Sequence, residues 1–320
     1  MADETGAVAD TEAAAGEGTA DGTGAAAYPE GVPCWVDVQL PDVEAGKRFY
    51  GELFGWTFKV APGDGAHELW AYSSGATTTP EATGSPKAAG SPGDPAASAP
   101  VAALAPKPDG RLPTVWTLHF ATPDAAALTA RITAAGGRVI TPPTRIGTLG
   151  TAVLATDPEG AVFGLWQAGT HHGFGRRHEP GTFTWAELYT RDTKAANAFY
   201  AHLFHDALFG PGAVPDVGRA ALTDVFPEVM PPHFLVHFGT ADCEAALGTV
   251  SRLGGRVQVP LFDTSYGHVA VVTDNQGASF ALLERSDGNG WQEVSREADP
   301  AEQRPDDLRQ RGDDEGEDAR

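Results

Sequence analysis

One pattern recurs four times along this chain of 320 residues, and it constrains the fold more than any other feature. In each copy a stretch of alternating apolar and polar residues leads to an Asp seven residues after the start, and apolar residues at helical spacing follow it. The copies start at Trp35, Thr117, Trp185 and Leu235, and their Asp residues are Asp42, Asp124, Asp192 and Asp242. Alternation is typical of a half-buried strand, and Asp is a favoured helix N-cap because its carboxylate accepts the free backbone N–H groups of the first turn. The repeat therefore predicts four modules that each begin with a strand and a helix.

The second and fourth copies continue into a shared strand–turn–strand pattern. The stretches "GTAVLATDPEGAVFGLWQ" and "GHVAVVTDNQGASFALLE" carry Gly, Asp and Gly at the same spacings. The tetrad 157–160 reads Asp-Pro-Glu-Gly, which suits a type I turn, and the tetrad 274–277 is its counterpart. Each module is thus a strand, a helix and several further strands. We therefore predict an α+β fold built from tandem βαβββ modules.

The spacing of the copies predicts two domains with unequal modules. The first two starts lie 82 residues apart and the last two lie 50 apart. A stretch rich in Pro, Ala, Gly and Ser at 76–100 lengthens the first module as a flexible insertion, and the third module is expected to have lost a strand or hairpin. We expect a first domain over 31–168, a linker over 169–182 and a second domain over 183–286. The linker histidines, which we expect to be solvated, are His171, His172 and His178.

The net charge of −21 comes largely from the two ends of the chain. Residues 1–30 hold seven acidic residues and no Lys or Arg, and residues 287–320 are dominated by charged side chains, so we predict disordered acidic tails. An acidic surface repels nucleic acid and anionic membranes, which favours a small-molecule partner. No apolar run approaches the roughly 20 residues of a membrane helix, and no secretory signal or disulfide framework is recognisable. These features predict a cytoplasmic protein.

The repeat resembles the βαβββ module of the vicinal oxygen chelate superfamily, which includes glyoxalases, bleomycin-resistance proteins and ring-cleaving dioxygenases. The motif D-x6-FY followed by L-F-G-W resembles the first module, and A-A-G-G-x-V with D-P-x-G-x-x-F-x-L-W resembles the second. The resemblance covers residues 32–285 and implies two domains, each with a cupped mixed sheet. The tandem form with W-x-E/D-L near each domain start is similar to an actinobacterial group labelled glyoxalase-like, or hydroxylase in antibiotic producers.

The metal ligands of that superfamily do not carry over to this chain. The first-strand ligand positions correspond to Trp35, Thr117, Trp185 and Leu235, none of which is a usual metal ligand. The positions at the ends of the second and fourth modules correspond to Gln167 and Glu284, of which only Glu284 suits a metal. A His/Glu site needs three or four converging side chains. The resemblance therefore predicts no metal and no other cofactor, and a shifted site formed by Glu187, His237 and Glu284 is the alternative.

Polar residues are expected inside both cups. Side chains two apart on a strand share a face, and the paired modules face each other, so Asp37 should lie opposite His119 and Glu187 opposite His237. Each acid–His pair either satisfies itself structurally, or contacts a ligand, or serves as a general acid/base couple in catalysis.

Aromatic residues head the first strand of each domain. Trp35 and Trp185 share the cup faces of the acids, and either pack in the core or form a flat wall for a planar ligand. Together with Gln167 and Glu284 they are the predicted ligand-binding residues.

These patterns favour a glyoxalase-like protein that binds or sequesters a small, partly aromatic organic molecule without a metal. One alternative is a hydroxylase, oxygenase or isomerase of secondary metabolism that uses the acid–His couple. A metal-dependent lyase or dioxygenase is a further alternative, and an interaction protein with vestigial cups is another. We expect a monomer, because paired modules of one chain complete each cup, with a homodimer as the alternative.

Overall fold

The computed structural model describes residues 28–62, 68–74, 98–110, 113–205, 207–210, 213, 216–222 and 230–285. Residues 76–97 of the predicted insertion, most of the predicted N-terminal tail and all of the predicted C-terminal tail lie outside these residues. The last residues assigned to the insertion, Ala99 and Pro100, instead begin a strand. Tyr28 and Glu30, which we assigned to the N-terminal tail, are instead attached to the folded chain. The Tyr28 hydroxyl donates to the Phe174 carbonyl at 3.2 Å, and Glu30 forms an ion pair with Arg131.

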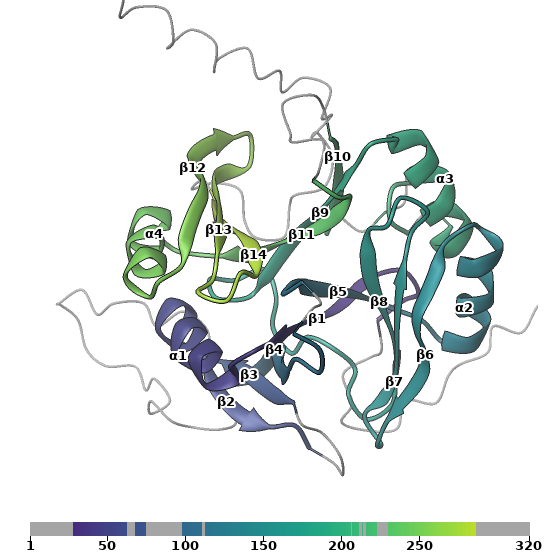
Figure 1. Ribbon diagram of the computed structural model, residues 1–320, viewed down its shortest axis with the longest axis horizontal. Helices are drawn as coiled ribbons and strands as arrows, with labels where there is room; N and C mark the ends of the chain where they lie inside the picture. The colour runs from purple at the N-terminus through teal and green to yellow at the C-terminus, as the bar shows by residue number, and fades with distance from the viewer. Residues whose placement is uncertain are drawn as a thin grey trace, which may run out of the picture.

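Two modules build the first domain around one eight-stranded sheet (Figure 1). The first module contains β1 (Pro33–Leu40), α1 (Val43–Phe54), β2 (Thr57–Val60), β3 (Leu69–Ser73) and β4 (Ala99–Pro106). The second contains β5 (Trp116–Ala121), α2 (Ala125–Ala134), β6 (Arg138–Ile146), β7 (Gly150–Thr156) and β8 (Val162–Ala168). The strand order is β2-β3-β4-β1-β5-β8-β7-β6, so antiparallel pairing of β1 with β5 joins the modules.

The second domain repeats this plan with a shorter first module and a six-stranded sheet. The third module contains β9 (Phe183–Thr190), α3 (Thr193–Phe204) and β10 (Val217–Ala221). The fourth contains β11 (His233–Gly239), α4 (Cys243–Arg252), β12 (Arg256–Thr264), β13 (Gly267–Thr273) and β14 (Ser279–Arg285). Because β10 pairs parallel with β9 as β4 pairs with β1, the strands β2 and β3 have no counterpart among the described residues of this module. The predicted α+β fold of tandem modules is confirmed.

The four repeated Asp residues begin the four helices as predicted. In each case an Asp side-chain oxygen accepts the backbone N–H of the residue three positions later at 2.9 Å. The N-caps are Asp42, Asp124, Asp192 and Asp242. No helix within the described residues is long and apolar enough to cross a membrane.

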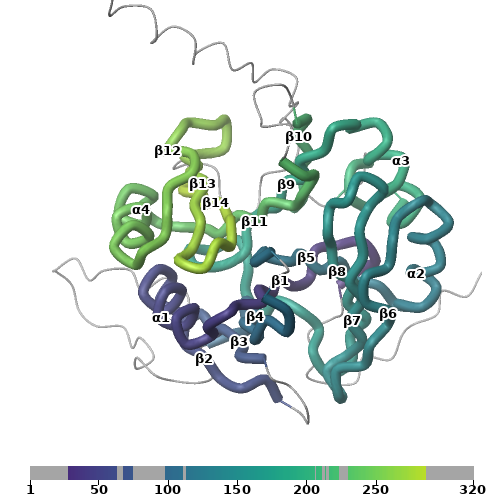
Figure 2. Tube along the Cα trace, in the orientation of Figure 1, coloured from purple at the N-terminus to yellow at the C-terminus, as the bar shows by residue number. Residues whose placement is uncertain are grey.

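The helix-side faces of the two sheets share one buried core. Helix α1 packs beside α4 and α2 beside α3, and the chain trace brings the purple N-terminal helix next to the yellow-green one (Figure 2). Each odd-numbered module thus docks its helix on an even-numbered module of the other domain. The buried cluster includes Val36, Leu118 and Val236 from the central strands of both sheets. Side chains on the opposite faces of these strands therefore point outward into two separate cups.

Two Tyr–Asp hydrogen bonds fasten the domains together. The Tyr50 hydroxyl of α1 donates to Oδ2 of Asp274 at 2.8 Å, and the Tyr200 hydroxyl of α3 donates to Oδ2 of Asp157 at 3.3 Å. Both Asp residues are the first residues of the predicted turns, where their Oδ1 atoms accept turn N–H groups, including Ala161 N and Ala278 N at 2.8 Å. Burial raises the pKa of both Tyr hydroxyls well above the usual range, and the facing carboxylate adds to the shift, so both remain protonated donors. The repeated Phe-Tyr motif is thus a contact between domains.

The third turn residues add a second pair of contacts between the domains. The Gln276 side chain accepts from Asp42 N at 2.8 Å and donates to Asp42 O at 2.9 Å. Glu159 accepts from Arg191 N at 2.9 Å and from Asp192 N at 3.2 Å. In both domains a turn therefore holds the start of the partner domain's helix.

Replacing Tyr50 by Phe should lower the free energy of unfolding by about 1–3 kcal/mol, because it leaves the buried Asp274 carboxylate and the Trp116 indole N–H without their hydroxyl partner. Urea unfolding followed by circular dichroism measures this change. Tyr72→Phe on the partly exposed β3 is the control and should have little effect. Equal losses in the two variants would refute a special role for the Tyr–Asp bond.

Candidate functional site

The cup faces of the two domains follow the same register. In the first domain Trp35 on β1 is paired with His119 on β5, and in the second Trp185 on β9 is paired with His237 on β11. The acids lie two residues further along β1 and β9, on the same faces as the Trp residues. Both sets therefore arise from the antiparallel pairing of the first strands of two adjacent modules.

The first cup brings Asp37 and His119 together. Nε2 of His119 lies 2.9 Å from Oδ1 of Asp37, and both side chains are largely buried. Burial by itself would lower the pKa of His119, but the charges of Asp37 and Glu68 and the hydrogen bond outweigh it, so the pKa lies above its ordinary value. Burial and the charge of Asp37 raise the pKa of Glu68 to about 6. The first cup thus holds a hydrogen-bonded carboxyl–imidazole pair, with the Glu68 carboxyl close enough for its charge to act on both partners.

Glu68 was missed by sequence reasoning, although the stretch "ELWAY" carries a signal for it. Glu68 and Trp70 are two residues apart at the start of β3 and therefore share the cup face. Glu68 lies outside the repeated strand–helix pattern, so that pattern does not indicate it.

The ring of His171 fills the space beside Trp35, which contradicts the expectation that the linker histidines are solvated. The His171 ring centroid is 4.4 Å from that of Trp35 and 4.2 Å from that of Trp70. His171 is 6 % exposed, and burial lowers its pKa to about 4, with the charges of His172 and His119 acting in the same direction. Trp35 therefore packs against other rings inside the first cup. Core packing was one of the two roles that we predicted for it.

The second cup does not form the expected acid–His pair. The Glu187 side chain hydrogen-bonds to Tyr189 on the same strand, and no hydrogen bond or ion pair joins it to His237. The position equivalent to Tyr189 in the first domain is Gln39, which is exposed, so Asp37 has no such partner on its own strand. Burial lowers the pKa of His237 to about 3, because no carboxylate of the described chain lies close enough to offset the loss of solvent.

The floor of the second cup is apolar and contains two polar atoms without partners. A separate buried cluster lines it, formed by Leu235, Val269, Ala281 and Leu283, with Tyr189 and Tyr266 packed against it. Nε1 of Trp185 and Nδ1 of His237 are buried without a hydrogen-bond partner among the described residues. The Trp185 ring lies over Gly218 of β10, where an added Cβ would come within 2.3 Å of the ring. Burial raises the pKa of the nearby Glu187 carboxyl.

Gln167 and Glu284 are wrong as cup residues. Oε1 of Gln167 accepts the backbone N–H of Ala125 at 3.0 Å, and Oε2 of Glu284 accepts that of Cys243 at 2.7 Å. Both therefore satisfy free N–H groups at the start of a helix, on the helix side of the sheet. Strand alternation explains the error. Gly164 is the residue of β8 that is paired with His119, so its position faces the cup. Gln167 lies three positions further along the strand, and an odd spacing places it on the opposite face. Ala281 occupies the same place beside His237.

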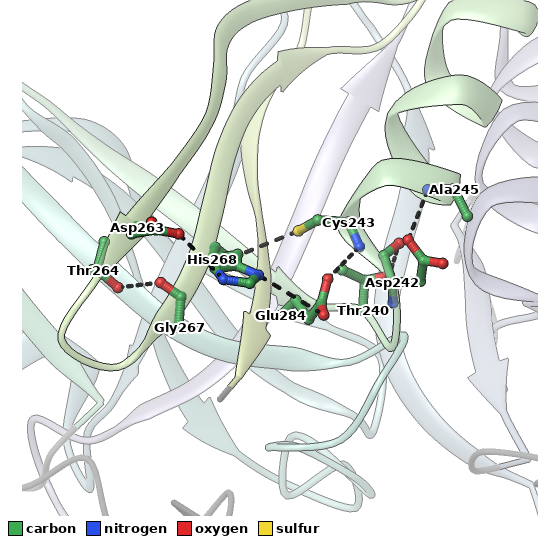
Figure 3. Close-up of polar contacts among 9 residues, drawn as sticks. All are labelled: Thr240, Asp242, Cys243, Ala245, Asp263, Thr264, Gly267, His268 and Glu284. Atoms are coloured by element: carbon green, nitrogen blue, oxygen red, sulfur yellow. Dashed lines mark hydrogen bonds and ion pairs between the residues drawn. The ribbon is translucent and has the colours of Figure 1, made fainter. Parts of the chain in front are cut away.

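The surroundings of Glu284 form a polar cluster at the start of α4 (Figure 3). Nε2 of His268 lies 3.2 Å from Oδ1 of Asp263, and its Nδ1 lies 3.9 Å from Oε1 of Glu284. The Cys243 thiol contacts the His268 carbonyl oxygen at 3.7 Å, and burial raises its pKa to about 12, so the thiol stays protonated. This cluster joins α4 to β13 and β14 outside the second cup.

The residues present do not fit the metal of the superfamily. No group of three or more His, Cys, Asp or Glu side chains is placed to hold a metal ion within the described part of the chain. The alternative set of Glu187, His237 and Glu284 is not assembled, because Glu284 is bonded to the N-terminus of α4 and Glu187 to Tyr189. No step of a mechanism is therefore assigned to a metal.

Wild-type protein should lose stability relative to a His237→Phe variant as the pH falls from about 7 to about 5. The folded pKa of His237 is about 3 against an ordinary 6.5, so below the ordinary value the unfolded chain binds a proton that the folded chain does not. The difference between the two proteins should change by on the order of 1–2 kcal/mol over this range. Urea unfolding at both pH values measures it.

The control for this titration is His202→Ala, which removes an exposed His of α3 and should keep the wild-type pH dependence. His119 and Glu68 contribute to all three proteins equally and cancel in the comparison. Parallel pH dependences for wild type and His237→Phe would show that His237 titrates normally in the fold.

Comparisons with known proteins agree with this architecture. The sequence profile of the glyoxalase/bleomycin resistance protein/dioxygenase superfamily matches residues 34–165. The protein CFP32 of Mycobacterium tuberculosis, which is named as a glyoxylase, is 34% identical over 270 residues, covering 80% of this chain and 95% of that protein. The anthracycline biosynthesis protein DnrV of Streptomyces peucetius is 33% identical over 274 residues, covering 82% of this chain and 96% of that protein.

A solved structure shares the fold at low sequence identity. The 2,3-dioxygenase LapB of Pseudomonas sp. KL28 superposes with a TM-score of 0.50 at 13% identity, covering 80% of this chain and 93% of that one. The full-length relatives and the tandem βαβββ architecture agree. The chain belongs to the glyoxalase/bleomycin resistance protein/dioxygenase superfamily.

Proposed function

We propose that this protein binds a small, partly aromatic organic molecule of secondary metabolism in the cup of its second domain, without a metal. The observation that carries the proposal is the pair of buried, unpartnered atoms Trp185 Nε1 and His237 Nδ1 on neighbouring strands of that cup. A buried polar group without a partner costs about 1–3 kcal/mol, and a bound ligand with hydrogen-bonding groups removes that cost.

The chemistry of the cup defines the class of ligand. The apolar floor of Leu235, Val269 and Leu283 favours a hydrophobic body, and the Trp185 ring offers a flat surface for stacking. The Trp185 indole N–H requires an acceptor, such as a carbonyl or phenol oxygen. The Glu187 carboxyl, with its raised pKa, sits beside this surface as a donor or acceptor for a polar edge.

The relatives support the biological setting. DnrV and a second relative, DauV of Streptomyces sp. strain C5, are both named anthracycline biosynthesis proteins. A role in the biosynthesis of an aromatic secondary metabolite fits the stacking surface and the indole N–H donor of Trp185, and this supports the proposal.

One observation favours catalysis as a second candidate function. Asp37, His119 and Glu68 in the first cup form a couple suited to proton transfer, as an isomerase or hydroxylase would use. The His171 ring lies inside this cup, whereas no acid–His pair forms in the second. Binding in the second cup therefore ranks first.

A Trp185→Phe variant should bind a planar quinone more weakly than wild type. The ring remains for stacking while the N–H is lost, so the dissociation constant for 9,10-anthraquinone-2-sulfonate should rise roughly 2- to 13-fold. Isothermal titration calorimetry measures it. Trp35→Phe makes the same replacement at the equivalent position of the first domain and is the matched control, with unchanged affinity expected. A Trp185→Phe affinity equal to that of wild type would refute this site.

Metal removal should leave binding unchanged. Protein dialysed against EDTA and the same protein supplied with Mn²⁺, Fe²⁺, Ni²⁺ or Zn²⁺ are expected to bind the quinone with equal affinity, because no metal ligands converge among the described residues of the cup. Binding that appears with one of these ions and disappears with EDTA would overturn the metal-free proposal.

A further inference from the structure

We infer that the first cup is a binding site for a flat aromatic ring, and that its occupant is the imidazole of His171 from the chain's own linker. The inference concerns the first domain and stands independently of the ligand proposed for the second. Its consequence is that, within the described part of the chain, an aromatic ring lies against the first-strand Trp in the first cup and not in the second.

The ring of His171 is enclosed by the rings of three Trp residues. It meets the Trp35 ring nearly edge-on, at an interplanar angle of 82°, and lies tilted over Trp70 at 39° with only 4.2 Å between the centroids. Trp166 is a third neighbour at 5.6 Å. Nε2 of His171 is buried without a hydrogen-bond partner among the described residues. Aromatic contact, and no side-chain hydrogen bond, therefore holds this ring in place.

Backbone hydrogen bonds keep the linker over the cup. Trp166 Nε1 donates to the His171 carbonyl at 2.8 Å, and His171 N donates to the Leu149 carbonyl at 3.1 Å. Further along, Phe174 N donates to Cys34 O at 2.8 Å, on the strand that carries Trp35. The linker is thus fixed on both sides of the ring, which indicates a permanent occupant.

The second cup lacks both the occupant and part of the wall. No aromatic ring contacts Trp185 among the residues that the structure describes, whereas Trp35 has three such neighbours. Trp70 lies on β3, and the third module has no counterpart of β3 within its described part. Both cups carry a Trp and an acidic residue on their first strand. They differ in whether an aromatic ring of the described chain already lies against that Trp.

The shape and charge of the first site define the ligand that would replace His171. The ring is five-membered, planar and uncharged at neutral pH, and one side of the cup carries Asp37 and His119. Small uncharged heteroaromatic rings match this site, and 4-methylimidazole, the side-chain fragment of histidine, matches it in its unprotonated form, which is the main one in mildly alkaline buffer.

Cavity complementation tests the inference. A His171→Ala variant should unfold at least about 4 °C below wild type, and millimolar 4-methylimidazole should raise its midpoint while leaving wild type unchanged. His202→Ala, an exposed His variant, should match wild type with and without the compound. A normal midpoint for His171→Ala, or an equal response of all three proteins to 4-methylimidazole, would overturn the inference.

A second comparison decides the matter if His171→Ala does not fold. His171→Phe keeps a flat ring, and His171→Leu has similar bulk without one. The Phe variant is expected to keep most of the wild-type midpoint and the Leu variant to lose more of it. Equal midpoints for Phe and Leu would show that the site does not select a ring. Because none of these measurements involves the second cup, failure of quinone binding there leaves their outcome unchanged.

Discussion

The hydrogen bonds of Tyr50 with Asp274 and Tyr200 with Asp157 are the contacts on which the arrangement of the two domains depends. Each joins a helix of one domain to a turn of the other and lies at the centre of the shared core. They hold the helix sides of both sheets together, so the opposite faces become two cups that open away from each other. Each cup is formed by two modules of the same chain.

The symmetry of this arrangement makes the differences between the cups informative. Both domains place a Trp and an acid on the first strand and a His on its neighbour. In the first, Asp37 meets His119, and His171 fills the space beside Trp35. In the second, Glu187 turns to Tyr189, and the polar atoms of Trp185 and His237 lack partners among the described residues. Among the described residues, the ring of His171 lies against Trp35 in the first cup, whereas no aromatic ring contacts Trp185 in the second.

Sequence periodicity predicted the fold because its causes are local. An Asp that caps a helix, or alternation along a strand, acts over a few residues, so the four helix starts could be predicted from spacing. The Asp37–His119 contact could be predicted only because the family resemblance also implied how the modules pair. The fold and the family membership are confirmed by the structure and the comparisons.

The errors in the site residues had two causes, a motif carried over in the wrong register and side-chain partners that depend on packing. Gln167 and Glu284 were placed on the wrong face because a motif position was carried over three residues out of register, and alternation alone would have corrected it. The loss of the Glu187–His237 pair depends on a neighbouring Tyr189, and the burial of His171 depends on how the linker crosses the first domain. No local pattern in the sequence carries that information.

The most direct test of this account is an NMR titration of ¹⁵N-Trp-labelled protein with 9,10-anthraquinone-2-sulfonate. The indole N–H signal of Trp185, assigned with the Phe variant, should shift on binding, because this N–H gains an acceptor. The Trp35 signal should stay in place, because the ring of His171 occupies its cup. A shift of Trp35 with Trp185 unmoved would place the ligand in the first domain and contradict the account.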